Sequence, residues 1–352
     1  MENCKRLAAQ VPECIDVEML SDVEAPQYEV DRTAEIQLKA RETRRVLSQV
    51  WRKSSYSGIV GDVTAPSVHS TPEKDYDEKE ADEGSTPTAE KESATQKIKL
   101  EGFVRNAVAG NCFHEMHEHL DFMSDDPEHM TEVVREKLIQ YGFDHEQWTK
   151  RICEAINDTL ETPLSDEVPK LKLANISTHK RLDEMEFLFP VAHDGNSLSA
   201  SRLADVFLRH AKTDEEKAYA ESLRKLQFGG LRGYLKGFID LIFEFDGKWY
   251  VSDYKSNYLG ERYGDFSKEK LNASMRHSHY ILQYHVYCVA LYRYLHSRLQ
   301  DIDFADYFGG VYYLYIKGMH PESGANTGVY FDRPSKELIV ELNELLQGGA
   351  EA

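Results

Sequence analysis

The chain has 352 residues and a formal net charge of −19, from 61 acidic residues against 42 lysines and arginines. This length suits one large domain with a tail, or two domains. The acidity argues against a protein that grips nucleic acid over its whole surface, because phosphate neutralisation needs basic side chains. No apolar run approaches the length of a membrane span, so we expect a cytoplasmic protein.

Residues 1–60 are predicted to form a tail, with little order up to about residue 28, a helix over residues 30–52 and then the segment WRKSSYSGI. The composition changes over residues 61–96, where nine acids and three lysines lie between Glu73 and Glu92. So few apolar residues cannot offset the loss of chain entropy, which predicts a disordered acidic linker. Residues 97–348 are predicted to be the folded domain.

The folded part begins with a predicted helix over residues 102–121, on which His114 lies four residues after Gly110. Read alone, such a histidine is more often structural than a metal ligand. Two further helical patterns follow, and the period then shortens to that of a strand over LKLANISTHKRLDEMEFLFP. Glu184 and Glu186 point the same way on that strand, and an exposed edge charge is the competing interpretation of each.

The most informative stretch is GYLKGFIDLIFEFDGKWYVSDYKSNYLG, which predicts two strands joined at Asp246-Gly247. An Asp-Gly pair favours a type I′ turn, because both central residues need positive φ. Such a turn places Asp240 directly opposite Asp253, with Lys255 on the same face. The opposite face is predicted to carry Ile239, Leu241, Phe243 and Tyr250.

Two carboxylates that face each other across a ladder repel, and a divalent cation between them removes that cost. Hard cations such as Mg²⁺ prefer carboxylate oxygen, and a nearby lysine can hold a water or a phosphate oxygen. This combination is suited to phosphodiester hydrolysis. On spacing alone, the favoured interpretation is a hairpin whose solvated end carries ordinary charges.

The segment after Lys255, SNYLGERYGDFSKEKLNASMRHSHY, is polar, basic and aromatic, and fits either a DNA contact or an ordinary solvated loop. A long helix is predicted over residues 281–298, where Gln283 and Tyr287 share a face with Tyr284 beside them. Aromatic residues at helical spacing usually belong to the core. Strands in YFGGVYYLYIK and TGVYFDRP and a helix over residues 334–346 are predicted to end the chain.

The pattern of Asp, then Asp-Tyr-Lys on the next strand, resembles the PD-(D/E)xK nuclease superfamily, and the hairpin looks like the C-terminal nuclease domain of the RecB (exonuclease V beta subunit) type. Four further blocks agree in the same order: KRLDEMEFLFP, LQYHVYCVALYRYL, YFGGVYYLYIKGM and TGVYFDRPSKELI. The resemblance runs from about residue 51 to the C-terminus, apart from the acidic stretch. It implies an α/β, restriction-endonuclease-like core, with a mixed central sheet flanked by helices.

The resemblance also implies a site with catalytic residues, metal ligands and residues that support the site or contact DNA. The implied catalytic residues are Asp240, Asp253 and Lys255, with Glu184 in a supporting role. The implied metal ligands are His114, Asp240, Asp253 and the main-chain carbonyl of Tyr254, and the implied supporting or DNA-contacting residues are Gln283, Tyr284 and Tyr287. The implied cofactor is Mg²⁺, or alternatively Mn²⁺.

Some relatives of this nuclease type hold an iron–sulfur cluster, but the five cysteines here lack the required spacing, so we expect none. They also form no CxxC pair or compact set of four, and so indicate neither a zinc site nor a disulfide framework. The chain has no GxxxxGK[ST] motif, so we expect no ATP site and no P-loop motor in it. The cysteines are Cys4, Cys14, Cys112, Cys153 and Cys288.

In function, the resemblance implies an Mg²⁺-dependent DNA nuclease, the nuclease part of an exonuclease V beta subunit that processes DNA ends in double-strand-break repair by recombination. It implies DNA, a helicase portion, and gamma and alpha subunits (RecC-like and RecD-like) as partners. Two alternatives stay open. The chain could be a free-standing nuclease of this type, because the motor is missing, or a non-catalytic docking module, against which the intact Asp, Asp and Lys argue.

Overall fold

The computed structural model describes residues 2–10, 14, 17, 52–60, 96–192, 198–228, 230–299 and 302–347. The chain divides into two units, Met1–Leu47 and Ser48–Ala352. In the first unit, α1 spans Glu2–Gln10, where the sequence pattern predicts little order. The helix predicted over residues 30–52 and the acidic linker lie outside the described residues, except for their ends at residues 52 and 96.

One mixed sheet lies at the centre of the second unit, with its strands in the order β1-β3-β4-β5-β6 and β2 paired with β3. The pairs β1–β3 and β4–β5 are parallel, and the other pairs are antiparallel. The expected mixed α/β fold is therefore confirmed. The strands are β1 (Arg52–Ser54), β2 (Arg181–Val191), β3 (Gly233–Phe245), β4 (Lys248–Lys255), β5 (Phe308–Tyr315) and β6 (Val329–Asp332).

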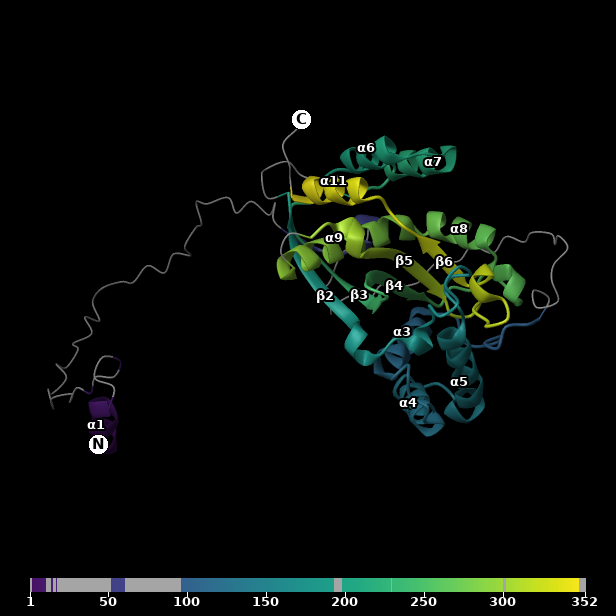
Figure 1. Ribbon diagram of the computed structural model, residues 1–352, viewed down its shortest axis with the longest axis horizontal. Helices are drawn as coiled ribbons and strands as arrows, with labels where there is room; N and C mark the ends of the chain where they lie inside the picture. Colours follow the sequence, from purple (N-terminus) through teal and green to yellow (C-terminus); the bar gives the residue numbers. More distant parts are fainter. Residues whose placement is uncertain are drawn as a thin grey trace, which may run out of the picture. The chain divides into compact units, whose positions relative to one another are not determined.

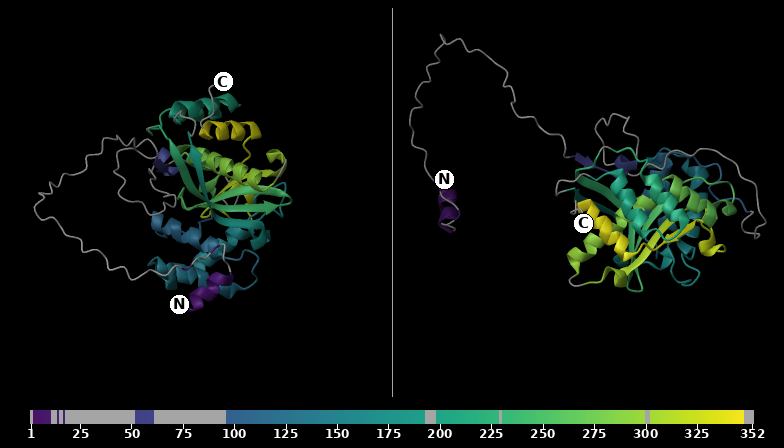
Figure 2. Two further views of the ribbon diagram at one scale, coloured as in Figure 1. Left: turned by 90° about the vertical axis from the view of Figure 1, so that its left-hand side faces the viewer. Right: turned by 90° about the horizontal axis from the view of Figure 1, so that it is seen from above.

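Helices cover both faces of this sheet (Figure 1), and the two views of Figure 2 show the same layers from other directions. One layer contains α3 (Ala107–His119), α4 (Pro127–Gln140) and α5 (His145–Glu161). The other contains α6 (Ala200–His210), α7 (Asp214–Leu223), α8 (Lys268–His277), α9 (Tyr280–Arg298) and α11 (Lys336–Gln347). Two short helices are α2 (Ser57–Val60) and α10 (Phe304–Tyr307). Among the described residues, no helix combines the length and apolar character needed to cross a bilayer.

The hairpin of β3 and β4 has the predicted turn and register. Asp246 and Gly247 have φ of 50° and 77°, as a type I′ turn requires. The ladder runs from Phe245↔Lys248 to Leu241↔Ser252. Continuing that numbering by one step brings Asp240 across from Asp253, where the backbone N–H of Tyr254 donates to Asp240 Oδ2 at 2.9 Å.

Side-chain alternation along β3 changes at Asp240. Ile239 packs in the same apolar cluster as Ile242 and Val251, beneath the layer that contains α9. Leu241 and Phe243 pack in the other cluster, beneath α3, α4 and α5. The prediction that Ile239 shares a face with Leu241 is therefore wrong, because strict period-2 alternation does not continue past Asp240.

Three other expectations differ from the structure. The first helix begins at Ala107, because the side chain of Asn106 caps it by accepting from the N–H of Ala109 at 2.8 Å. Residues 171–180 form two 3₁₀ turns rather than a strand, which begins only at Arg181. The segment after Lys255 is not a solvated loop: it contains α8, and its Tyr263 and Phe266 are buried.

Residues 52–60 contribute to the sheet and its core. β1 pairs with β3 at Gly233, and Tyr56 and Ile59 pack in the cluster beneath α9. The hydroxyl of Tyr56 also donates to the carbonyl of His279 at 2.6 Å. This segment therefore packs against β3 and the core beneath α9, which are far away from it in the sequence.

Candidate metal centre

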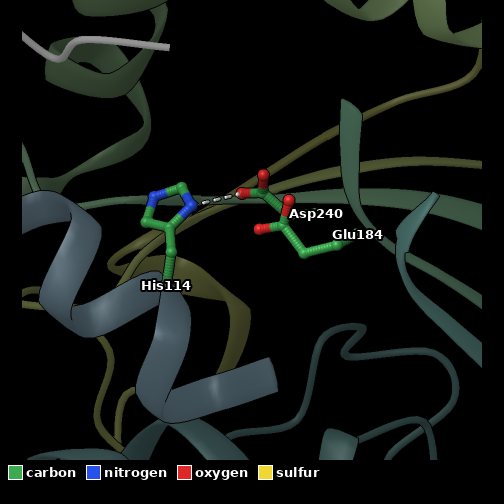
Figure 3. Close-up of side chains that lie close together, drawn as sticks. All are labelled: His114, Glu184 and Asp240. Carbon is green, nitrogen blue, oxygen red and sulfur yellow. Dashed lines mark ion pairs between the residues drawn. The ribbon is translucent and has the colours of Figure 1, made fainter. Parts of the chain in front are cut away.

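Three separate elements bring His114, Glu184 and Asp240 together, from α3, β2 and β3 respectively (Figure 3). One ligand atom from each of these residues lies within 4.8 Å of the others. Nδ1 of His114 lies 3.1 Å from Oδ2 of Asp240. One imidazole nitrogen and two carboxylates form a donor set that fits a divalent cation, because carboxylate oxygen suits hard cations and imidazole is a common further ligand.

The backbone of β2 departs from regular strand geometry at this cluster. The pairs Asp183↔Leu241 and Met185↔Ile239 flank Glu184 and Asp240, which the regular pairing skips. Glu184 has a φ of 48°, a conformation that costs a residue other than glycine about 1–3 kcal/mol. Such strain is typically found at functional sites, and here it accompanies a carboxylate that points at Asp240.

A glycine lets α3 approach the end of β4. A Cβ placed on Gly110 would lie 3.2 Å from Oγ of Ser256, which directly follows Lys255. Because His114 lies one helical turn after Gly110, this close packing also brings the imidazole to β3. The spacing of Gly110 and His114 therefore has a packing reason in this fold.

Asp253 and Lys255 form a buried ion pair beside the cluster. The distance between Oδ1 of Asp253 and Nζ of Lys255 is 2.8 Å, and both residues are 1% exposed. The Lys255 ammonium also lies 4.1 Å from the ring centroid of Tyr280 and 5.4 Å from that of Tyr313. These aromatic faces favour a cation electrostatically and limit where the ammonium can move.

The two facing carboxylates have opposite pKa shifts. Burial raises the pKa of Asp253 well above its ordinary value, and the charge of Asp240 raises it further. Burial also acts to raise the pKa of Asp240, but His114, Lys255 and the Tyr254 N–H together bring it below the ordinary value. Two carboxylates in one buried site therefore do not ionise equally, and a cation bound between them would favour ionisation of both.

The structure places the predicted site residues unequally. Glu184 was predicted only to support the site, but it lies in the cluster with His114 and Asp240. Asp253 is not part of that cluster and pairs with Lys255. The N–H of Tyr254 donates to Asp240. Metal binding by Asp253 and by the Tyr254 carbonyl stays a prediction.

The three residues predicted on α9 are all buried, and they lie in different contacts. Gln283 accepts a hydrogen bond from the hydroxyl of Tyr313 at 2.8 Å, and so holds a ring that lies near Lys255. Tyr287 makes an edge contact with Phe187. Tyr284 donates to Asp332 at 2.6 Å and lines a separate cavity of 270 Å³.

The sequence interpretation missed Tyr280. Of the two aromatic rings that contact the Lys255 ammonium, the ring of Tyr280 is the closer one. The available signal was helical spacing, because Tyr280 lies three residues before Gln283 and therefore shares its helix face. It was missed because the helix was predicted to begin at Ile281, whereas α9 begins at Tyr280.

Behind the cluster, the ring of His117 stacks on that of Tyr254, with centroids 4.4 Å apart. The Nδ1–H of His117 donates to the carbonyl of Phe113 at 2.7 Å. Burial lowers the pKa of His117 from 6.5 to about 4, because it disfavours the charged ring. His117 is therefore neutral in the folded protein at physiological pH.

The His117→Phe variant is expected to lose less stability in mild acid than the wild type does. The unfolded chain binds a proton at this position below about pH 6.5, whereas the folded protein binds it only below about pH 4. Stability of the wild type is therefore lost as pH falls from 6.5 towards 4, by about 2 kcal/mol at pH 5. Urea unfolding at pH 7.5 and pH 5 measures this difference.

His119→Phe is the matched control, because His119 is an exposed histidine on the same helix. It is expected to keep the pH dependence of the wild type. An identical change in unfolding free energy between the two pH values for wild type and His117→Phe would contradict the assignment of a neutral, buried imidazole.

Comparison with known proteins gives a consistent result. A family model described as the PD-(D/E)XK nuclease superfamily matches residues 90–348. The RecBCD enzyme subunit RecB of Escherichia coli (strain K12) is 33% identical over 325 residues, which are 91% of this chain and 25% of that subunit. RecB of Haemophilus influenzae is 35% identical over 270 residues, or 77% of this chain and 20% of that subunit.

RecB of Mycolicibacterium smegmatis is 30% identical over 341 residues, which are 89% of this chain and 30% of that subunit. The chain thus spans between 20% and 30% of the length of these relatives. The resemblance to RecB-type nuclease domains is confirmed, and so is the nuclease class that it implies. The family model covers well over half of the chain and includes His114, Glu184 and Asp240, and on this basis the chain belongs to the PD-(D/E)XK nuclease superfamily.

Proposed function

We propose that this chain is a DNA nuclease that hydrolyses phosphodiester bonds and depends on Mg²⁺, with Mn²⁺ as a substitute. The observation that carries the proposal is the cluster of His114, Glu184 and Asp240 beside the buried pair of Asp253 and Lys255. A docking module would gain nothing from a strained carboxylate and a buried ammonium, both of which cost stability. An active site can use both.

In this proposal, His114, Glu184 and Asp240 hold the cation, and Asp253 contributes a carboxylate oxygen from the neighbouring strand. When bound, the cation acts as a Lewis acid on the phosphoryl group and promotes ionisation of the attacking water. The Tyr254 N–H holds the Asp240 carboxylate in its orientation through the bond to Oδ2.

Lys255 is proposed to orient the attacking water and to offset charge on the phosphoryl oxygens. The rings of Tyr280 and Tyr313 and the carboxylate of Asp253 restrict its ammonium before substrate binds. A preorganised charge of this kind stabilises a developing negative charge without the reorganisation that water would need. Gln283 supports the arrangement through its bond with Tyr313.

The relatives are described as RecB subunits of the RecBCD enzyme, and we propose that this chain is the nuclease part of a subunit of that kind. Its partners would then be DNA, a helicase portion, and RecC-like and RecD-like subunits, and its role would be DNA-end processing in double-strand-break repair. Affinity capture of the chain from its own cells separates this context from a free-standing nuclease. Recovery with a helicase-bearing partner is expected.

The nuclease proposal itself is tested with purified protein on labelled linear and circular DNA. We expect degradation in Mg²⁺ and in Mn²⁺, no degradation in EDTA, and no requirement for ATP, because the chain contains no P-loop motif. The control is the Asp240→Asn protein under the same conditions. Intact DNA after prolonged incubation with wild type in both metals would refute the proposed activity.

A further inference from the structure

The start of α3 and the chain that leaves β4 run side by side from the metal centre to the protein surface. Two contacts join them, Gly110 with Ser256 and Arg105 with Tyr258. At the inner end of the path, His114 of α3 contacts Asp240 of β3. Tyr258 lies three residues after Lys255, so their Cα atoms are at most about 11 Å apart even in an extended chain. The outer contact therefore lies close to the proposed reaction site.

At this outer contact, the guanidinium carbon of Arg105 lies 3.2 Å from the ring centroid of Tyr258. Arg105 is exposed and Tyr258 is half-buried. The contact with the ring restricts the orientation of the guanidinium, while its side chain stays exposed to solvent. A fork of donors held in this way is suited to a phosphate group.

The charge environment of Arg105 bears on what it can bind. In the part of the chain that the structure describes, three other cations near the segment that follows β4 are held by carboxylates: Lys97 by Glu101, Lys270 by Asp265, and Arg276 by Glu215. Arg105 makes no ion pair with a carboxylate within that part of the chain, and its contact is the ring of Tyr258. Its charge is therefore available to an external anion.

Two apolar side chains accompany this cation. Val104 and Val108 are each 46% exposed, one on either side of Arg105 in the sequence. An exposed surface that combines an arginine, an aromatic ring and apolar groups is typical of sites that contact the backbone and bases of single-stranded nucleic acid. We call Val104, Arg105, Val108 and Tyr258 the α3 entrance surface.

We propose that the α3 entrance surface binds the substrate strand of single-stranded DNA, with Arg105 contacting a phosphate and Tyr258 positioning Arg105. This inference rests on the proposed DNA nuclease function and assigns the path by which the strand reaches the metal centre.

The test measures binding of a fluorescein-labelled oligo(dT) by fluorescence anisotropy in EDTA, over a series of salt concentrations, so that no cleavage occurs. Arg105→Ala is expected to weaken binding at low salt and to reduce the slope of log Kobs against log[salt] by about 0.7, the value for one phosphate contact on a single strand. Arg105→Lys keeps the charge and is expected to keep the slope, with weaker binding because the planar stack is lost.

Tyr258 is tested separately from the charge. Tyr258→Leu is expected to weaken binding about fivefold, because Arg105 loses the ring that positions it, whereas Tyr258→Phe keeps the ring and is expected to bind within about twofold of wild type. In Mg²⁺ cleavage assays, Arg105→Ala is expected to raise KM about tenfold and to leave kcat within about twofold, because the contact is made equally in the ground and transition states.

Arg135→Ala on α4 is the matched control, since it removes another exposed arginine, one that stacks on no ring among the described residues. It is expected to keep the salt slope and KM of wild type. If wild type cleaves DNA but Arg105→Ala matches Arg135→Ala in slope and KM, the inferred path is wrong while the nuclease function stands. If wild type neither binds nor cleaves DNA, the proposed function itself fails.

Discussion

Replacing Asp240 by Asn is expected to lower the rate of Mg²⁺-dependent DNA cleavage by about a thousandfold or more. Asp240 is the residue that His114, Glu184 and the Tyr254 N–H all surround. An amide oxygen can still accept from that N–H, so the backbone arrangement is kept. What is lost is the negative charge that holds a cation.

A readout independent of catalysis accompanies this prediction. Mn²⁺ at a hundred times its Kd is expected to stabilise the wild type by about 2.7 kcal/mol, seen as a rise in Tm, and this rise should disappear in Asp240→Asn. Without metal, the variant is expected to be somewhat less stable than wild type, because His114, Lys255 and the Tyr254 N–H favour the charged form of Asp240 in the folded protein. A metal-dependent Tm that survives the substitution would place the cation elsewhere.

The control for Asp240 lies in the same hairpin. Asp246 is exposed in the turn, with a φ of 50°, a conformation that Asn adopts as readily as Asp. Asp246→Asn therefore removes one carboxylate charge from the hairpin without changing the turn. Cleavage rate and metal-dependent Tm should both equal those of the wild type.

Replacing Lys255 by Gln is the second large effect, with an expected fall of about a hundredfold to a thousandfold in kcat. The variant should also lose about 3–5 kcal/mol of stability, because it leaves the Asp253 carboxylate buried without its partner. Lys255 is 1% exposed, so water cannot replace the lost interaction. Steady-state cleavage kinetics and urea unfolding measure the two effects separately.

The double variant Asp253→Asn/Lys255→Gln distinguishes chemistry from folding. It removes both charges of the buried pair, so stability should recover towards that of the wild type, while cleavage stays absent. Lys248→Gln, on the same strand β4, is the control for loss of a lysine and should cleave normally. Recovery of cleavage along with stability in the double variant would show that Lys255 acts only in folding.

Several features of the site follow from the sequence because local rules determine them. The Asp246-Gly247 turn requires positive φ at both residues, and a two-residue turn then sets the pairing of β3 with β4 without tertiary information. That pairing predicted Asp240 across from Asp253, with Lys255 on their face. The ion pair of Asp253 with Lys255 has the geometry that this register implies.

Other features depend on contacts that no local pattern contains. Glu184 joins the cluster because a positive φ interrupts β2 opposite Asp240, a conformation that no local turn motif predicts for glutamate. Tyr284 is next to Gln283 in the sequence, yet its hydroxyl donates to Asp332 on β6 in a separate cavity. Side-chain alternation on β3 also changes at Asp240. Ile239 packs beneath the layer that contains α9, whereas Leu241 packs beneath the layer that contains α3.

By itself, then, the sequence determined the turn, the register of the central hairpin and the pair of acids beside a lysine, since these depend on residues close together in the chain. Only the tertiary structure decided that His114 and Glu184 join Asp240 in the cluster. It also decided that the rings of Tyr280 and Tyr313 contact Lys255. Those groups come from α3, β2, α9 and β5, which are tens of residues away, and long-range packing of the two helical layers against the sheet sets their positions.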